Sequence, residues 1–91
     1  MTFYAQLLFF LGVVPCNNAV YITTSDVNGL NKQGFYCHNT DIGNGSGYGF
    51  LMVIRVSDTS PYVLQYDMGS SKVCIRISGS GGYDWTPWRD L

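Results

Sequence analysis

Residues with acid–base potential are few, and they do not form a recognisable catalytic set. The only histidine is His38, which lies close to Asp41 in the sequence, and no serine stands in a Gly-x-Ser-x-Gly context. All six acidic residues are aspartates, and nothing in the sequence marks two of them as the carboxylate pair that glycoside cleavage needs. We therefore expect His38 to be a surface or capping residue and the protein not to be an enzyme.

Three cysteines, Cys16, Cys37 and Cys74, cannot all pair within one chain. They lack Cys-x-x-Cys spacing, and a single histidine leaves too few ligands for a structural zinc site. Buried thiols are expected, with a Cys37–Cys74 bridge as the alternative, and the odd number favours assembly in a reducing cytoplasm. No metal or other cofactor is predicted. The glycines from Gly43 to Gly47 lack the strand-to-helix setting of a phosphate-binding loop.

Charge is scarce and dispersed along the chain. Charged residues make up 12% of the sequence and the net charge is −1, whereas an average soluble domain is about 25% charged. The five cations stand singly, so no basic stripe could neutralise a row of phosphates, and nucleic acid is not an expected partner. The aromatic fraction of 15% argues against disorder.

Loop residues are the best candidates for recognition, because scaffolds present binding groups on loops. Aromatic and small polar side chains suit adaptable contacts with sugars or protein loops. The candidates are Asn44, Ser46, Tyr48, Tyr62, Tyr83 and Asp84. The alternative for each one is a solvated turn residue that contacts nothing.

Four other aromatic residues are assigned structural roles instead. Trp85 and Trp88 could form a stacking platform for sugars, but we favour their burial at one end of the sheet. Phe35 and Tyr36 lie inside a predicted strand and are also expected in the core.

Short β-branched and aromatic runs, separated by Gly, Ser, Asn and Pro, predict strands and turns from residue 20 onwards. The expected strands are 20–24, 34–37, 50–56, 62–68 and 72–78, and residues 85–89 close the chain. Residues 25–31 form a turn or a single helical turn. The fold class is therefore all-β, a small antiparallel meander with at most one helical turn.

Hydrophobic patterning assigns the faces of the later strands. The run from Phe50 to Val56 is apolar on both faces until Arg55, so a central strand covered on both sides is expected. The run 72–78 alternates, which predicts Val73, Ile75 and Ile77 inward and Arg76 outward.

Three segments resemble the knob domain at the tips of phage tail fibres and the related R-type pyocins. They are Asp26-Val27-Asn28-x-Leu30 leading to Gly34-Phe35-Tyr36, then Gly49-Phe50-Leu51-x-Val53-x-Arg55, then Cys74-Ile75-Arg76 leading to Trp85-x-x-Trp88-Arg89. The resemblance covers roughly residues 22–91. It implies a homotrimeric fibre whose tip binds a glycan or an outer-membrane protein on a bacterium.

The first residues form a separate segment. Phe3-Tyr4-Ala5-Gln6-Leu7 resembles the end of a fibre stem, and an apolar run follows it. No Lys or Arg precedes that run and no clean cleavage site follows, so a signal peptide is disfavoured. The run is also too short to span a membrane, and membrane insertion is not expected. We assign residues 1–20 to a stem-like oligomerisation segment and 21–91 to the knob.

The sequence thus predicts a virion component, made in the host cytoplasm, that attaches a phage tail fibre to a bacterial surface glycan such as lipopolysaccharide. Two alternatives remain within the fibre interpretation. The chain could be a structural module that trimerises and caps a fibre, or a prophage remnant that binds no receptor. A small secreted lectin is a third alternative, and it would require a cleaved N-terminus.

Overall fold

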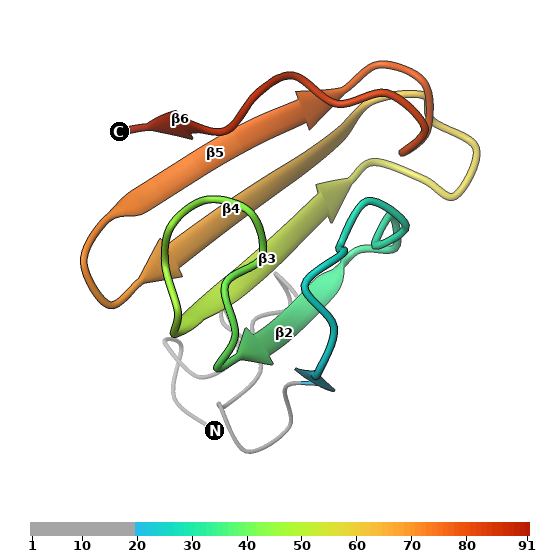
Figure 1. Ribbon diagram of the computed structural model, residues 1–91. Helices are drawn as coiled ribbons and strands as arrows, with labels where there is room; N and C mark the ends of the chain where they lie inside the picture. The colour runs from blue at the N-terminus through green and yellow to red at the C-terminus, as the bar shows by residue number, and fades with distance from the viewer. Residues whose placement is uncertain (1–19) are drawn as a thin grey trace, which may run out of the picture.

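The computed structural model describes residues 20–91, which form one six-stranded sheet with the strands in chain order (Figure 1). The strands are β1 (Val20–Ile22), β2 (Gly34–His38), β3 (Gly49–Arg55), β4 (Val63–Gly69), β5 (Val73–Ser78) and β6 (Arg89–Asp90). No helix occurs in this part of the chain, so the predicted all-β class is confirmed. The stem-like assignment of residues 1–19 lies outside the described residues, and Val20 belongs to β1.

The sheet is mixed and not wholly antiparallel. Strands β2 to β6 form the expected antiparallel meander, but β1 pairs parallel to β2, with Val20 opposite Tyr36 and Ile22 opposite His38. Parallel neighbours need a crossover connection. Residues 23–33 supply it, and they bring Val27 into the core.

Among residues 20–91, no helix is long and apolar enough to cross a membrane.

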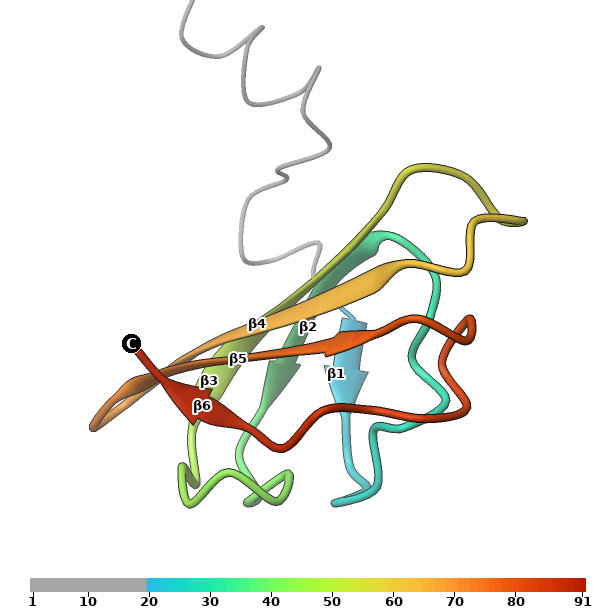
Figure 2. The same ribbon diagram turned by 90° about the horizontal axis from the view of Figure 1, so that it is seen from above.

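One face of the sheet is covered by loops (Figure 2). The core lies under them and contains Leu51 and Val53 from β3 and Val63 from β4, all at most 1% exposed. The covering residues Val27 and Ile42 complete it together with Ile22 of β1, and Leu30, Tyr36, Trp85 and Trp88 pack against it. We call this the covered face.

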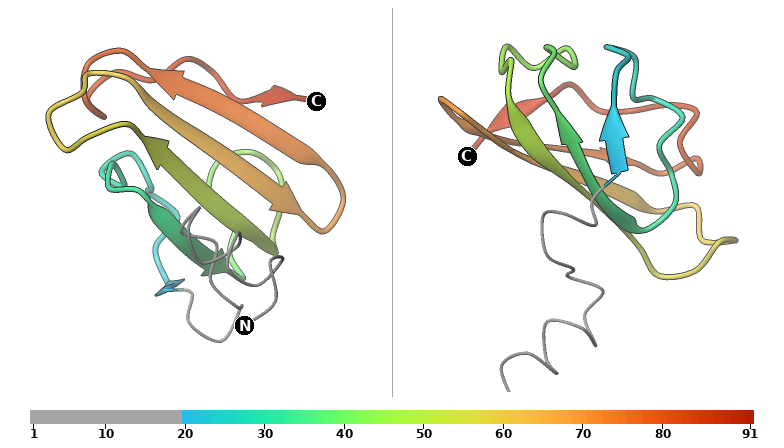
Figure 3. Two further views of the ribbon diagram at one scale, coloured as in Figure 1. Left: turned by 180° about the vertical axis from the view of Figure 1, so that it is seen from behind. Right: turned by 90° about the horizontal axis from the view of Figure 1, so that it is seen from below.

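The predicted orientation of β5 is wrong. Cys74, Arg76 and Ser78 point into the covered face and are 0%, 8% and 0% exposed, whereas Ile77 is 49% exposed on the opposite face. The expectation that β3 is covered on both sides also fails within the described residues. Ile54 is 40% exposed on that same opposite face, which is turned towards the viewer in the left view of Figure 3.

Arg76 is held in the interior by aromatic rings and one amide. Its guanidinium carbon lies 4.5 Å from the ring centroid of Trp85 and 4.6 Å from that of Trp88, a sandwich of two cation–π contacts. Its Nε donates to Oε1 of Gln65 at 2.8 Å. Burial lowers the pKa of Arg76 to about 10, so the side chain is still charged at neutral pH.

Gln65 is the partner that explains this orientation. It is 0% exposed, and its Nε2 donates to the backbone oxygens of Val27 at 2.8 Å and Leu30 at 3.0 Å. Both amide hydrogens and the amide oxygen are therefore bonded. Trp85 adds a similar link, because its Nε1 donates to the backbone oxygens of Asn28 and Gly82. Gln65 of β4 faces inward because it bonds the backbone of the covering residues 23–33, and Arg76 of β5 faces inward because it bonds Gln65.

We predict that Arg76→Ala destabilises the fold by about 2–4 kcal/mol, because it leaves Oε1 of Gln65 buried without its donor and a void between two indoles. Lys32→Ala, at an exposed position, serves as the control and should change stability by less than about 0.5 kcal/mol. Urea unfolding followed by tryptophan fluorescence measures both. Equal, small effects of the two substitutions would show that Arg76 does not occupy this site.

Candidate functional site

A buried histidine–aspartate pair lies where β2, β3 and β4 meet the loop of residues 39–48. Nε2 of His38 is 2.7 Å from Oδ1 of Asp67, and both side chains are 0% exposed. Nδ1 of His38 is 2.8 Å from the backbone oxygen of Thr40, and Oδ2 of Asp67 accepts from Nδ2 of Asn44 at 2.8 Å. The expectation of a surface or capping role for His38 is therefore wrong.

Proton counting defines the chemistry of this pair. The oxygen of Thr40 can only accept, so Nδ1 of His38 carries a hydrogen. One further proton then lies between Nε2 and Oδ1 of Asp67, whichever of the two atoms holds it. The pair is neutral overall and fully bonded, which is the condition under which buried ionisable groups are tolerated. Both side chains are buried, and through Asn44 and Thr40 the pair holds the loop of residues 39–48 against the sheet.

The loop of residues 39–48 is organised from within by its own polar side chains. Oδ1 of Asp41 accepts from the backbone N–H groups of Gly43 at 2.8 Å and Gly45 at 3.0 Å. These bonds hold the pKa of the Asp41 carboxyl below its usual value. Asn44 is 5% exposed and Ser46 is 0% exposed.

Asn44 and Ser46 must therefore be removed from the predicted recognition residues. Oδ1 of Asn44 accepts from the backbone N–H of Ser46 at 3.0 Å, and the hydroxyl of Ser46 donates to the backbone oxygen of Tyr48 at 2.9 Å. Their hydrogen-bonding capacity is directed into the protein. The sequence placed them correctly in a loop but could not show that the loop folds back onto the sheet.

The remaining four candidates are exposed, but they lie at two opposite ends of the sheet. Tyr48 is 66% exposed and precedes the first residue of β3. Tyr62 is 68% exposed and precedes β4, and Tyr83 is 88% exposed beside the exposed Asp84 in the loop after β5. Because β3 and β4 are antiparallel, Tyr48 lies at the end of the sheet away from the other three. We call the end with Tyr62, Tyr83 and Asp84 the Tyr62 end.

The two loops of the Tyr62 end are tied together. The backbone N–H of Gly81 donates to the oxygen of Pro61 at 2.8 Å, and Nδ2 of Asn31 donates to the oxygen of Gly81 at 2.9 Å. Beside them, the hydroxyl of Ser80 accepts from the N–H of Asp84 at 2.7 Å. The structure therefore brings Tyr62, Tyr83 and Asp84 onto neighbouring, hydrogen-bonded loops.

The predicted structural aromatics divide between the two faces. Trp85, Trp88 and Tyr36 lie on the covered face and pack against the core. Burial raises the pKa of Tyr36, whose hydroxyl donates to the backbone oxygen of Lys32 at 3.2 Å. Phe35 is half-buried on the opposite face, because it alternates with Tyr36 along β2.

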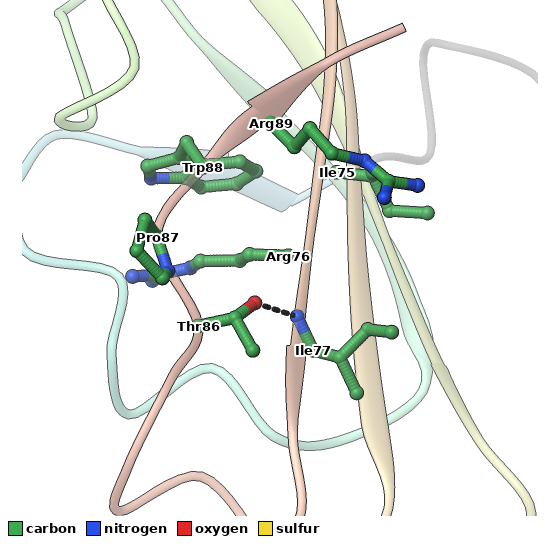
Figure 4. Close-up of a pocket in the computed structure, with 7 residues that line it drawn as sticks. All are labelled: Ile75, Arg76, Ile77, Thr86, Pro87, Trp88 and Arg89. Carbon is green, nitrogen blue, oxygen red and sulfur yellow. Dashed lines mark hydrogen bonds between the residues drawn. The ribbon is translucent and has the colours of Figure 1, made fainter.

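A hollow of about 410 Å³ lies between β5 and the returning residues 86–89 (Figure 4). Thr86 closes one end of it, since its hydroxyl accepts from the N–H of Ile77 at 3.0 Å. Figure 4 shows Arg76 and Trp88 on one side of β5, and Ile75, Ile77 and Arg89 on the other side of it. Within residues 20–91, no group of His, Cys and Asp side chains could hold a metal ion.

The Cys37–Cys74 bridge considered from the sequence does not form. The two residues lie on strands β2 and β5, with β3 and β4 between them. Cys74 is buried, and burial together with the nearby Asp90 raises the pKa of its thiol. Cys16 lies outside the described residues.

In comparisons with known proteins, no family model, curated protein or solved structure matches the chain.

Gly49 lies opposite His38 and Gly69 in the sheet, directly beside the buried pair. A Cβ atom there would be 2.6 Å from Nε2 of His38 and 2.8 Å from Oδ1 of Asp67. We predict that Gly49→Ala destabilises the fold by about 1–3 kcal/mol through overpacking. Gly47→Ala is the matched control, because nothing lies within 4 Å of a Cβ at that position. Thermal unfolding measures both variants, and an unchanged midpoint for Gly49→Ala would contradict the described position of the pair.

Proposed function

We propose that this protein is a non-catalytic receptor-binding module at the tip of a phage tail fibre, and that it binds a bacterial surface glycan through the Tyr62 end. The resemblance to tail-fibre knobs supports the fibre assignment. The residues of that resemblance also share a physical role here, since Val27, Leu51 and Val53 form the core and Arg76 lies between Trp85 and Trp88.

The single observation that carries glycan recognition is the exposure of Tyr62 and Tyr83 on neighbouring, fixed loops. Tyr83 is 88% exposed and Tyr62 is 68% exposed. The bond from the N–H of Gly81 to the oxygen of Pro61 holds the two loops together. Two exposed aromatic rings on adjoining loops place apolar surface close together, and exposed apolar patches mark binding sites more often than single exposed residues do.

The chemistry of these side chains matches a saccharide. A tyrosine ring offers an apolar face to the C–H groups of a pyranose and a hydroxyl to its oxygens. The carboxylate of Asp84 can accept hydrogen bonds from vicinal sugar hydroxyls. Loops already fixed by hydrogen bonds lose little conformational entropy on binding, which favours affinity from a small contact area.

On this proposal the module is homotrimeric, joins the rest of a tail fibre, and works on the virion after synthesis in the host cytoplasm. An outer-membrane protein is the alternative receptor. A second function, a fibre cap that trimerises without binding a receptor, is favoured by a separate observation: the face of the sheet opposite the loops is apolar and exposed.

We predict that the fluorescently labelled full chain binds intact Gram-negative cells in a strain-selective manner, and that periodate oxidation of the cells abolishes binding. Tyr62→Ala combined with Tyr83→Ala should lower cell-bound fluorescence at least about tenfold, because truncating buried aromatic anchors commonly costs 2 kcal/mol or more. Flow cytometry over a dilution series gives the affinity.

Tyr48→Ala is the matched control, because Tyr48 is as exposed as Tyr62 but lies at the other end of the sheet. Loss of binding in the Tyr48 variant alone would move the site to that end. Binding that survives periodate but not protease treatment of the cells would identify a protein receptor. A folded chain that binds no strain would favour the cap.

A further inference from the structure

The face opposite the loops carries an apolar side chain at every position in four adjacent strands. The register arranges these residues in three rows across β2 to β5. The rows are Phe35, Met52, Tyr66 and Ile75, then Cys37, Phe50, Met68 and Val73, then Ile54, Leu64 and Ile77. We call this surface the open face.

No charged residue interrupts the open face. Arg89 borders the face at one edge, where it pairs with Ile75 on the short strand β6 and lies on the same side as Ile75 in Figure 4. At the other edge, Tyr21 of β1 pairs with Cys37. In an antiparallel sheet with one face in solvent, the side chains on that face are normally polar. Here the polar residues of β4 and β5 are on the covered face, so the apolar ones meet solvent in a single chain.

Apolar side chains of the open face are more exposed than is usual on the surface of a soluble monomer. Met68 is 54% exposed, Ile77 is 49% exposed and Ile54 is 40% exposed. Contiguous apolar patches of this extent on soluble proteins mark interaction surfaces. Four strands about 4.8 Å apart and about six residues long present a flat footprint on the order of 400 Å². That footprint is about half of the roughly 800 Å² of accessible surface that each partner buries in a stable complex, and the relief of the side chains adds to it.

The open face also has two hollows that side chains of a partner could fill. A hollow of about 420 Å³ lies at one corner and is lined by Tyr21, Phe50 and Met68 among others. A second, of about 220 Å³, lies at the opposite corner between Ile54, Leu64 and Ile77. Side chains of a facing sheet can enter such hollows, and sheets pack face to face about 10 Å apart with interdigitated side chains.

We infer that the open face is the surface through which copies of this chain associate. A second copy is the occupant that the composition favours, because the side chains of β2 to β5 on this face carry no charge and meet no like-charge repulsion when they pack against themselves. The apolar side chains on both copies then leave water together. This deepens the proposed fibre function, which implies a trimer, by assigning the interface to named residues.

The first test is the mass of the full chain by light scattering between about 1 and 100 μM. We expect two or three times the 10.1 kDa chain mass. Ile54→Lys and Ile77→Lys each place a charge on the open face at positions already 40% and 49% exposed in one chain, so the monomer fold should tolerate them. Each should weaken association at least about tenfold, because a lysine would be buried in the interface without a partner.

Asn39→Lys is the matched control, because it adds the same charge at an exposed loop position outside the open face. It should leave the mass unchanged, and circular dichroism checks the fold of all three variants. A wild-type chain that remains monomeric throughout the concentration range would overturn the inference. So would folded Ile54→Lys and Ile77→Lys variants that keep the wild-type mass.

A measurement on the wild-type chain alone avoids any effect of mutation on folding. Hydroxyl-radical footprinting should show Met68 protected several-fold at high concentration and oxidised on dilution, while Tyr83, outside the open face, reacts equally throughout. Protection of Met68 that does not change as the mass falls to one chain would mean that something other than a second copy covers this face.

The outcomes for the interface and for the proposed function are distinguishable. An oligomeric chain that binds no cells would overturn recognition and leave the interface in place. A monomeric chain that binds cells through Tyr62 and Tyr83 would overturn the interface and the trimer and leave recognition by the Tyr62 end in place.

Discussion

Gln65 has no contact with solvent, yet its side-chain amide bonds the backbone of Val27 and Leu30 and the guanidinium of Arg76. The constraint behind this arrangement is that loops cover the sheet. A helix or a second sheet satisfies its own backbone groups, but a loop does not, and each buried polar group without a partner costs free energy. The sheet must therefore supply hydrogen-bonding side chains to its cover. Gln65 does so at one end of β4, and Asp67 does so towards the other through Asn44 and His38.

This requirement decides which way the strands face. Side chains alternate along a strand, so once Gln65 and Asp67 point at the loops, Leu64 and Tyr66 must point away. The same holds on β5, where the inward position of Arg76 sends Ile75 and Ile77 outward. The open face is thus a consequence of the polar covered face. When the polar side chains of a sheet point towards the loops that they bind, the apolar side chains lie on the second face, which a partner can cover.

Local sequence patterns predicted where the strands lie, but not which face of the sheet their side chains point to. The strands at 34–38, 49–55 and 63–69 lie within one or two residues of those expected, because β-branched runs bounded by Gly and Pro act locally. The parallel pairing of β1 and the inward direction of Arg76 depend on contacts between residues far apart in the chain. The same is true of the candidate site, where the exposure of Tyr62 and Tyr83 agrees with their loop positions. Asn44 is buried because it bonds Asp67 of β4, and Ser46 is buried with its hydroxyl bonded to the backbone oxygen of Tyr48. Alternation gives two equivalent faces, and hydrophobicity alone selected the wrong one.

The two proposed surfaces are compatible because they are perpendicular. The proposed recognition residues lie where strands end, and the open face lies along the strands. If copies are related by a rotation axis that runs along the strands with open faces inward, every Tyr62 end points in the same direction. A receptor-coated cell then meets several weak sites at once, and each contact after the first is effectively intramolecular, which raises avidity without any new contact. The loop cover that forces the apolar residues outward therefore also allows the tyrosines to be presented as a set.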